Sequence, residues 1–429
     1  MSTVCVHGLG YIGLPTAAML ATNGYEVFGY DTDAAVLEAV RDADVGLGEP
    51  GLEELLSLAV EAEKLIPVDD VTEAEYHVVC VPTPFDEETR RPGLEYVDAA
   101  AEGIAPVLRE GDTVILESTV PPGTTEARLG PVLERTGLVA GRDFGLAHCP
   151  ETVLPGNMLE ELRTNERIVG GVDRNSTEAA VALYDSFVDA RIRTTNNPTT
   201  AEFVKLIQNT FRDANIALAN ETARIAHDYG VDSREAIDLA NAHPRVDMLT
   251  PGPGVGGHCL PVDPWFLGVG SDSLELIPAA RAVNDGMSEF VVELLRELLG
   301  DLDDTRIAVL GAAYKGNVDD TRKSPGLALA RTLRKGPGIA SPATDGGSPG
   351  TPTVIVHDPH VDDPSLELES LDAATTNADA VVITTDHDAF AGLDPHTLGE
   401  RMAARNVVDT KGVLRLQQWR DAGFSTRRV

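Results

Sequence analysis

The N-terminal segment ending at Asp31 contains the pattern that most constrains the fold. Thr3 to His7 is typical of a short buried strand, and Gly8-Leu9-Gly10-Tyr11-Ile12-Gly13 follows it directly. Residues 14–23 have a helical composition, residues 25–30 predict a second strand, and Asp31 comes next. This order of strand, glycine turn, helix, strand and acid predicts a dinucleotide-binding βαβ unit in a parallel sheet.

The glycines of this turn have separate physical roles. Gly8 permits the tight turn, Gly10 lets a pyrophosphate approach the backbone, and Gly13 lets the helix pack on the strand. The unpaired N–H groups at the helix N-terminus would face the phosphates. Asp31 can accept both ribose hydroxyls, and no arginine stands beside it to receive a 2′-phosphate, which favours NAD over NADP. A glycine-rich turn without a ligand is the alternative.

A second unusual segment, residues 251–266, is rich in glycine and proline and contains one cysteine. Glycine suits a backbone that turns sharply or passes close to a ligand, and proline stiffens the remainder. A structural cysteine usually lies in an apolar run. Cys259 instead lies in this rigid loop, with Asp263 four residues later, which favours a nucleophile. An inert loop cysteine is the alternative.

Length and charge indicate a large soluble enzyme of two or three domains, because the chain has 429 residues. There is no apolar run of membrane-spanning length, no signal peptide, and no disulfide or metal spacing among four cysteines, so we expect a cytoplasmic protein without a metal. The formal net charge of −35 is spread along the chain. It predicts a halophilic surface and excludes nucleic acid as a partner.

Polar residues follow several predicted strands of the first domain. Thr83 follows a strand at 76–81, Thr119 follows one at 113–117, and Glu151 ends one at 146–151. Ligands bind at the carboxyl edge of open α/β sheets, so these side chains are candidates for a site. Turn or capping chemistry is the alternative for the two threonines.

A long helix is predicted after Asn197-Pro198, with a capping box at Thr199–Glu202 and an end near Asp228. Lys205, Asn209 and Asp213 are spaced four apart and form one polar stripe on it. A solvated face is the usual explanation. In an acidic chain with few lysines, however, this stripe favours burial beside a ligand.

The C-terminal part opens a second strand–helix unit at Thr305–Gly311, and Lys315 follows shortly after. Its next strand is delayed by residues 336–353, which are almost wholly Gly, Pro, Ser, Ala and Thr. We expect this segment to be a flexible surface insertion.

The whole chain resembles the UDP-glucose/GDP-mannose dehydrogenase family. The segments that carry the resemblance are Gly8–Pro15, Val81–Phe85, Glu117–Thr125, Cys149–Gly156, Phe203–Glu221, Pro251–Phe266 and Gly311–Pro325. Asn209–Asn215, His243–Val246 and Pro251–Phe266 look most like the members that oxidise UDP-N-acetyl-D-mannosamine. Two residues depart from that pattern: Thr152 stands where arginine is usual, and Gly316 stands where proline is common.

The resemblance implies an α/β fold of two Rossmann-like doubly wound domains joined by a long central helix and a helical middle domain. The expected domains are 1–195 for NAD, 196–298 for dimerisation and the catalytic loop, and 299–429 for UDP. A homodimer is also implied, and Arg245 would reach the partner's site.

The implied reaction is a four-electron oxidation of a sugar C6 alcohol to a carboxylate, with two NAD used in succession. The implied role of this reaction is in polysaccharide biosynthesis. Cys259 would form a thiohemiacetal and then a thioester, Lys205 and Asn209 would stabilise the oxyanion, and Asp263 would orient water. The implied catalytic residues are Cys259, Lys205, Asn209, Asp263, Glu151 and Thr119. The implied cofactor-binding residues are Gly8, Gly10, Tyr11, Ile12, Gly13, Asp31, Thr83 and Thr119. The implied substrate-binding residues are Arg245, Gly256, Lys315 and Arg322.

Several functions remain open at this point. UDP-N-acetylglucosamine or UDP-glucose is the alternative substrate within the family. A two-electron hydroxyacid dehydrogenase on the same fold would have no use for Cys259. A non-catalytic NAD-binding sensor would need neither Lys205 nor Asp263.

Overall fold

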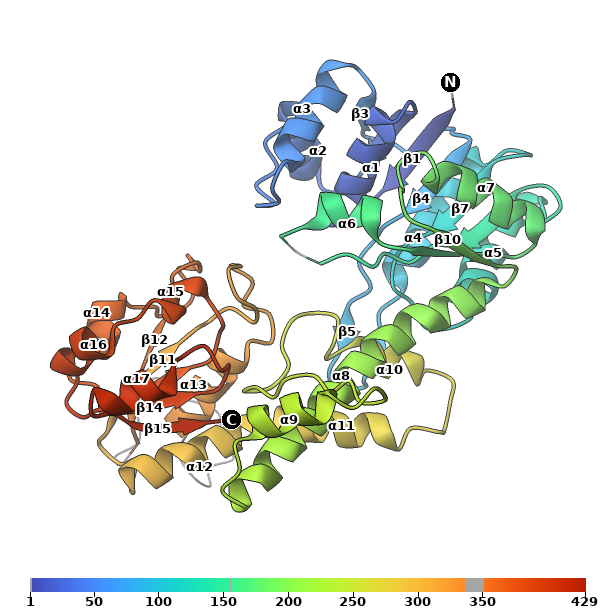
Figure 1. The fold of residues 1–429 in the computed structure, drawn as a ribbon. Coiled ribbons are helices and arrows are strands. Elements are labelled where there is room, and N and C mark those ends of the chain that lie inside the picture. Colours follow the sequence, from blue (N-terminus) through green and yellow to red (C-terminus); the bar gives the residue numbers. More distant parts are fainter. Residues whose placement is uncertain (1, 155, 336–350) are drawn as a thin grey trace. The chain divides into compact units, whose positions relative to one another are not determined.

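The computed structural model describes residues 2–154, 156–335 and 351–429. These residues form two compact units (Figure 1). The N-terminal unit comprises the chain up to Gln208 together with Trp265–Asp272, and the C-terminal unit comprises Asn209–Pro264 and Ser273–Val429. Helix α8 (Pro198–Asp228) contributes residues to both, and each unit is described by itself.

The N-terminal unit is built on an eight-stranded sheet of order β10-β9-β8-β7-β4-β1-β2-β3. Its strands are β1 (Thr3–His7), β2 (Glu26–Tyr30), β3 (Leu65–Val68), β4 (Tyr76–Val79), β7 (Thr113–Leu116), β8 (Gly145–His148), β9 (Arg167–Gly171) and β10 (Ile192–Thr195). Neighbouring strands are parallel, apart from the antiparallel pair β8–β9. A small hairpin of β5 (Phe85–Asp86) and β6 (Arg91–Pro92) stands outside this sheet.

Helices cover both faces of this sheet, because alternate residues of each buried strand point to opposite sides. Val6 and Val78 pack in one apolar cluster with Leu20, whereas Val79 and Leu116 belong to a second cluster. The helices of the unit are α1 (Gly13–Thr22), α2 (Ala34–Asp42), α3 (Leu52–Glu61), α4 (Glu95–Ile104), α5 (Gly130–Leu133), α6 (Met158–Thr164) and α7 (Arg174–Tyr184), with short turns at Ala105–Val107, Thr125–Leu129 and Glu134–Thr136. This is the doubly wound arrangement that the sequence predicts.

The C-terminal unit holds a parallel five-stranded sheet of order β12-β11-β13-β14-β15. Its strands are β11 (Arg306–Leu310), β12 (Thr353–His357), β13 (Ala380–Ile383), β14 (Asn406–Asp409) and β15 (Ser425–Arg428). Its helices are α9 (Ser233–Asn241), α10 (Asp263–Leu267, which extends into the N-terminal unit), α11 (Leu276–Asp285), α12 (Met287–Leu299), α13 (Pro325–Lys335), α14 (Leu371–Thr375), α15 (Asp388–Ala391), α16 (Pro395–Arg401) and α17 (Leu416–Asp421). Two apolar clusters again line this sheet. Of the predicted insertion, residues 336–350 lie outside the described residues.

The start of α8 differs from the predicted capping box. Asn197 Oδ1 accepts a hydrogen bond from Thr200 N at 2.9 Å, and Pro198 is the first helical residue. Glu202 does not reach back to the helix start, because its buried carboxylate accepts from Gly123 N at 2.5 Å and Thr125 N at 2.7 Å. The predicted capping box is therefore wrong. Asn197 caps the free N–H groups at the start of the helix, and Pro198 lacks an N–H that would need a partner.

Candidate functional site

The glycine turn after β1 has the close contacts that a dinucleotide unit requires. Gly8 has a left-handed φ of +89°, and a Cβ there would lie 2.6 Å from the Cys80 carbonyl oxygen. A Cβ at Gly13 would lie 1.9 Å from the Gly8 carbonyl oxygen, so only glycine lets α1 pack this close. A Cβ at Gly10 would meet nothing within 4 Å. Space for a ligand therefore remains beside Gly10, next to the N-terminus of α1.

Asp31 follows β2 and lies against this turn. Its Oδ2 accepts from Leu9 N at 2.8 Å, and its Oδ1 accepts from Asp33 N at 3.0 Å. Each oxygen keeps a further lone pair for a hydroxyl donor. The glycine turn, the helix N-terminus and this carboxylate fit the pyrophosphate and ribose of a dinucleotide.

Thr83 and Thr119 come together at the carboxyl ends of β4 and β7. The Thr83 hydroxyl donates to the Thr119 carbonyl oxygen at 2.8 Å. Thr83 is buried and Thr119 is half-buried. This bond links the two loops, so turn chemistry accounts for part of what the threonines do.

Lys205 and Glu151 form a buried ion pair in the N-terminal unit. Lys205 Nζ lies 2.8 Å from Glu151 Oε1 and donates to the Glu151 carbonyl oxygen at 2.8 Å. Burial by itself would raise the pKa of Glu151, but the ammonium group outweighs it and the pKa lies below the usual value. The carboxylate is therefore ionised at neutral pH. The ion pair holds the Lys205 side chain beside the loop that follows β8.

Asn209 and Asp263 form a second pair, within the C-terminal unit. Asn209 Nδ2 donates to Asp263 Oδ2 at 2.6 Å. Asp263 is buried at the start of α10, and its backbone N–H donates to the Cys259 carbonyl oxygen at 2.8 Å. The cysteine itself is exposed. The structure thus brings three of the predicted catalytic residues together within this unit.

The loop that carries Cys259 packs on residues 314–325. A Cβ at Gly256 would lie 2.7 Å from the Lys323 carbonyl oxygen, and one at Gly257 would lie 2.9 Å from the Tyr314 ring. Gly257 N donates to the Arg322 carbonyl oxygen at 2.8 Å. Glycine at these positions therefore permits a close approach between two backbone segments, as the sequence pattern indicates.

The predicted substrate cations have different surroundings. Arg322 Nη2 donates to Asp320 Oδ2 at 2.5 Å, and this ion pair holds the guanidinium in place. Hydrogen bonding to Asp320 is also the largest cause that raises the pKa of Arg322. Arg245 lies on an exposed stretch after α9, and Lys315 lies in the loop after β11.

Two buried contacts were not predicted. Asp213, the third residue of the polar stripe, pairs with Arg281 Nη1 at 2.6 Å and with Asn284 Nδ2 at 2.8 Å. Glu49 accepts from the Tyr11 hydroxyl and from Gly156 N, and so joins the glycine turn to the loop after Glu151. Local patterns do not reveal such partners, because 68 residues separate Asp213 from Arg281 and 107 separate Glu49 from Gly156.

A buried group of metal-ligand types occurs among the described residues, although the sequence spacing predicts no metal. The ligand atoms of Cys5, His7 and His77 lie within 4.8 Å of one another. His7 Nε2 and His77 Nδ1 are already hydrogen-bonded at 3.1 Å, and burial lowers the pKa of both imidazoles. The contact is that of a neutral imidazole pair inside the sheet.

Comparison with known proteins places these features in one family. Residues 2–188 match the NAD binding domain of the UDP-glucose/GDP-mannose dehydrogenase family, residues 199–286 its central domain, and residues 308–416 its UDP binding domain. The chain belongs to the UDP-glucose/GDP-mannose dehydrogenase family. It is an NAD-dependent nucleotide-sugar dehydrogenase, and its fold class, cofactor and family resemblance are confirmed.

Relatives within the family are similar over the whole chain. A UDP-N-acetyl-D-mannosamine dehydrogenase of Methanococcus maripaludis is 40% identical, over 99% of this chain and 96% of its own. An NDP-N-acetyl-D-galactosaminuronic acid dehydrogenase of Ralstonia solanacearum is 39% identical, over 96% of each chain. The structure of the UDP-D-ManNAc dehydrogenase of Pyrococcus horikoshii superposes with a TM-score of 0.90 at 41% identity, covering 100% of this chain and 99% of the other.

The dehydrogenase has no helix among its described residues that is long and apolar enough to cross a membrane. Its predicted domain limits, at 195/196 and 298/299, stay predictions, as do the roles of the individual site residues.

Proposed function

We propose that the enzyme oxidises the C6 alcohol of UDP-N-acetyl-D-mannosamine to the uronate, in two successive NAD-dependent steps. The similarity to dehydrogenases named for N-acetylated sugars supports the substrate. The observation that carries the reaction is the exposed Cys259 in its glycine-rich loop, with Asp263 N bonded to its carbonyl oxygen and Asn209 on the Asp263 carboxylate. A two-electron dehydrogenase needs no such thiol.

The residues divide the chemistry as follows. Bound NAD would supply the hydride acceptor for each oxidation. In the first step C6 loses a hydride and its hydroxyl releases a proton to water, which gives an aldehyde. The Cys259 thiolate then adds to that aldehyde, and the resulting oxyanion is stabilised by the Lys205 ammonium and the Asn209 amide. Loss of the second hydride from C6 gives a thioester.

Water then cleaves the thioester, releasing the carboxylate and the thiolate. Asp263 orients that water, with help from Thr119, and Glu151 takes up its proton. The bond from Asn209 supports this role, because it fixes the Asp263 carboxylate. In the pair with Glu151, Lys205 is held as a cation before substrate binds.

We also propose which residues contact the cofactor and the substrate. Gly8, Gly10 and Gly13 with Asp31 hold NAD, because the turn leaves room only beside Gly10. Tyr11, Ile12, Thr83 and Thr119 complete that set. The diphosphate and sugar meet Arg245, Lys315 and Arg322 beside Gly256.

A panel of four sugars tests the substrate. UDP-N-acetylmannosamine, UDP-N-acetylglucosamine, UDP-glucose and GDP-mannose are assayed side by side for kcat/KM. We expect the first to exceed the others strongly, because a site that hydrogen-bonds the acetamido group rejects sugars that lack it. A better kcat/KM for UDP-glucose or UDP-N-acetylglucosamine would leave the family assignment standing and overturn the member assignment.

We also propose a homodimer formed through α8. Phe211, Leu218 and Ile225 are spaced seven apart, so they share one face of the helix, and Tyr229 directly follows the end of the helix. Their exposed fractions are 61%, 53%, 50% and 79%. An apolar stripe of this size on an otherwise acidic protein is typical of an interface, and a second copy offers the matching stripe by symmetry.

The remaining proposals concern the setting of the enzyme. The net charge of −35 supports a halophilic protein, because dense surface charge needs salt to screen it. A catalytic thiol suits a reducing cytoplasm. A uronate attached to UDP is an activated unit for polysaccharide biosynthesis.

A further inference from the structure

The loop after β11, residues 311–324, begins in the same way as the NAD-binding turn. Gly311 has a left-handed φ of +122°, and a Cβ at Gly326 would lie 2.0 Å from the Gly311 carbonyl oxygen. Asp358 follows β12 as Asp31 follows β2. The C-terminal unit therefore repeats the order of strand, glycine turn, helix, strand and acid, with a longer loop before its helix.

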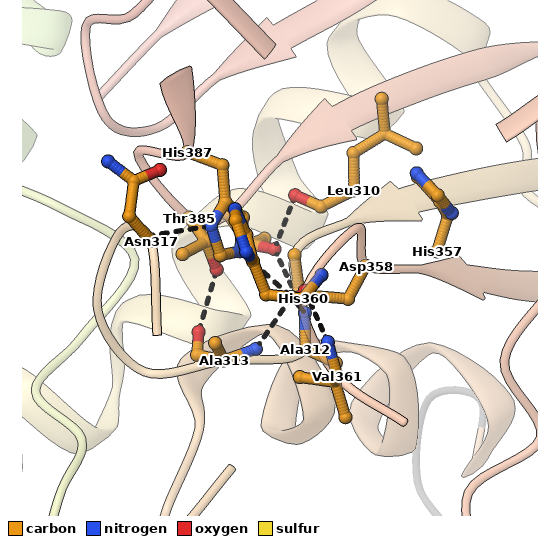
Figure 2. Close-up of polar contacts among 12 residues, drawn as sticks. Leu310, Ala312, Ala313, Asn317, His357, Asp358, His360, Val361, Thr385 and His387 are labelled. Carbon is orange, nitrogen blue, oxygen red and sulfur yellow. Dashed lines mark hydrogen bonds and ion pairs between the residues drawn. The ribbon is translucent and has the colours of Figure 1, made fainter. Parts of the chain in front are cut away.

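The carboxylate of Asp358 is already occupied, however (Figure 2). Its Oδ2 accepts from Ala312 N at 2.7 Å and from Ala313 N at 2.9 Å. Its Oδ1 accepts from His360 N at 2.9 Å and from Val361 N at 3.2 Å. A carboxylate with this many internal donors has little capacity left for ribose hydroxyls. The acid holds the start of the loop instead of a nucleotide.

His387 connects Asp358 to the far end of the loop, and it is fully buried. Its Nε2 lies 2.9 Å from Asp358 Oδ2, and its Nδ1 accepts from Asn317 N at 2.9 Å. The backbone N–H of Asn317 requires a lone pair on Nδ1, so the ring proton is on Nε2 and is donated to Asp358. Although burial opposes it, the His387 bond and the backbone donors lower the pKa of Asp358 to about 2.

Lys315 lies between the two ends that this pair holds. Thr385 adds a bond to the Ala313 carbonyl oxygen at 2.7 Å. A Cβ at Gly316 would lie 2.4 Å from the Asp386 carbonyl oxygen, so a side chain does not fit at this point of the loop. The backbone path on either side of Lys315 is thus set by contacts with residues that follow β12 and β13.

We propose that Asp358 and His387 are positioning residues for substrate binding, because together they fix the loop that presents Lys315 to the UDP diphosphate. This rests on the proposed function of Lys315. The pair acts on the affinity for the UDP portion rather than on hydride transfer or NAD binding, which is assigned to the N-terminal unit.

Three substitutions at His387 separate its two bonds. An asparagine oxygen takes the place of Nδ1, so His387→Asn keeps the bond from Asn317 N. A glutamine amide takes the place of Nε2, so His387→Gln keeps the bond to Asp358. His387→Leu loses both. The matched control is His360→Asn. The exposed His360 ring packs on His387 with the ring centroids 4.8 Å apart, and the hydrogen bond from His360 to Asp358 comes from the backbone N–H, which the substitution keeps.

The readouts are the KM for the UDP-sugar, the Kd for UDP by calorimetry, the KM for NAD, kcat and Tm. In His387→Leu and His387→Gln we expect the KM and the UDP Kd to rise about tenfold, the effect of freeing one buried donor. The NAD KM and kcat should stay within about twofold. His387→Asn, which loses only the bond to Asp358, should raise the UDP Kd less than His387→Gln does, and His360→Asn should resemble the wild type.

Equal UDP affinity in the asparagine and glutamine variants would overturn the proposal, and so would a parallel loss of NAD affinity. If His387→Leu does not fold, the comparison of UDP affinity between His387→Asn and His387→Gln still tests the proposal. A wild-type enzyme that neither binds UDP nor oxidises a UDP-sugar would refute the proposed function instead of the positioning role.

Discussion

Replacing Arg281 by methionine tests whether the polar stripe on α8 ends in a structural ion pair. Arg281 and Asp213 are 5% and 1% exposed, and Arg281 Nη1 lies 2.6 Å from Asp213 Oδ1. Without the guanidinium, the carboxylate keeps only the bond from Asn284 Nδ2, which lies 2.8 Å from Asp213 Oδ1. Breaking a buried pair from one side costs about 3–5 kcal/mol, because an uncompensated charge remains. The remaining bond from Asn284 favours the lower value, about 3 kcal/mol.

The loss should depend on pH in a defined direction. Burial already raises the pKa of Asp213, and removal of Arg281 removes the main opposing cause. A folded-state pKa above the unfolded value means that stability is present at low pH and is lost as pH rises through the folded pKa. The variant should therefore approach the wild type as the pH falls and differ most from it at high pH.

Thermal unfolding of full-length protein in constant high salt is the assay. A loss of about 3 kcal/mol lowers Tm by roughly 6–12 °C in a cooperative unit of 150–250 residues. The exposed Arg296→Met on α12 is the matched control and should change Tm little. Adding Asp213→Asn to Arg281→Met should restore most of the loss, with the substrate KM unchanged. A small loss without pH dependence, or a KM that rises with Asp213→Asn, would show that the stripe serves a ligand instead.

Three further results are expected. Tm and activity should rise between dilute buffer and molar KCl because the net charge is −35, and a flat Tm would refute the halophilic proposal. Burial raises the pKa of Glu202 from 4.5 to about 7, so stability should fall by on the order of 3 kcal/mol as pH rises through that range, and Glu202→Gln should flatten the profile of Tm against pH. Leu218→Glu should give a monomer by light scattering, whereas Glu221→Gln on the exposed surface of the same helix should not; a dimeric Leu218→Glu would remove α8 from the interface.

Local sequence predicts the parts of this structure that depend on neighbouring residues. The glycine turn after β1 follows from backbone geometry, because only glycine fits at Gly8 and Gly13. The long helix follows from composition, and its end near Asp228 agrees with α8. Cys259 and Asp263 are four apart in one loop, so their proximity could also be expected.

Contacts between distant segments could not be predicted in this way. The predicted capping box is wrong because the Glu202 carboxylate accepts hydrogen bonds from the backbone of Gly123 and Thr125, which are nearly eighty residues away in sequence. Likewise, Asp358 and His387 fold onto the loop before α13 from separate strand ends. Such partners are set by the order of strands in the sheet, which periodicity and composition do not specify.

The yield of NADH per molecule of UDP-N-acetylmannosamine consumed tests the central claim most directly. The assay uses limiting sugar and excess NAD, and it identifies the product by mass. Four-electron oxidation through Cys259 predicts two NADH and a uronate from the wild type, and no net uronate from Cys259→Ala, which should still bind NAD. One NADH with an aldehyde product, or an unchanged yield of acid from Cys259→Ala, would contradict the covalent mechanism.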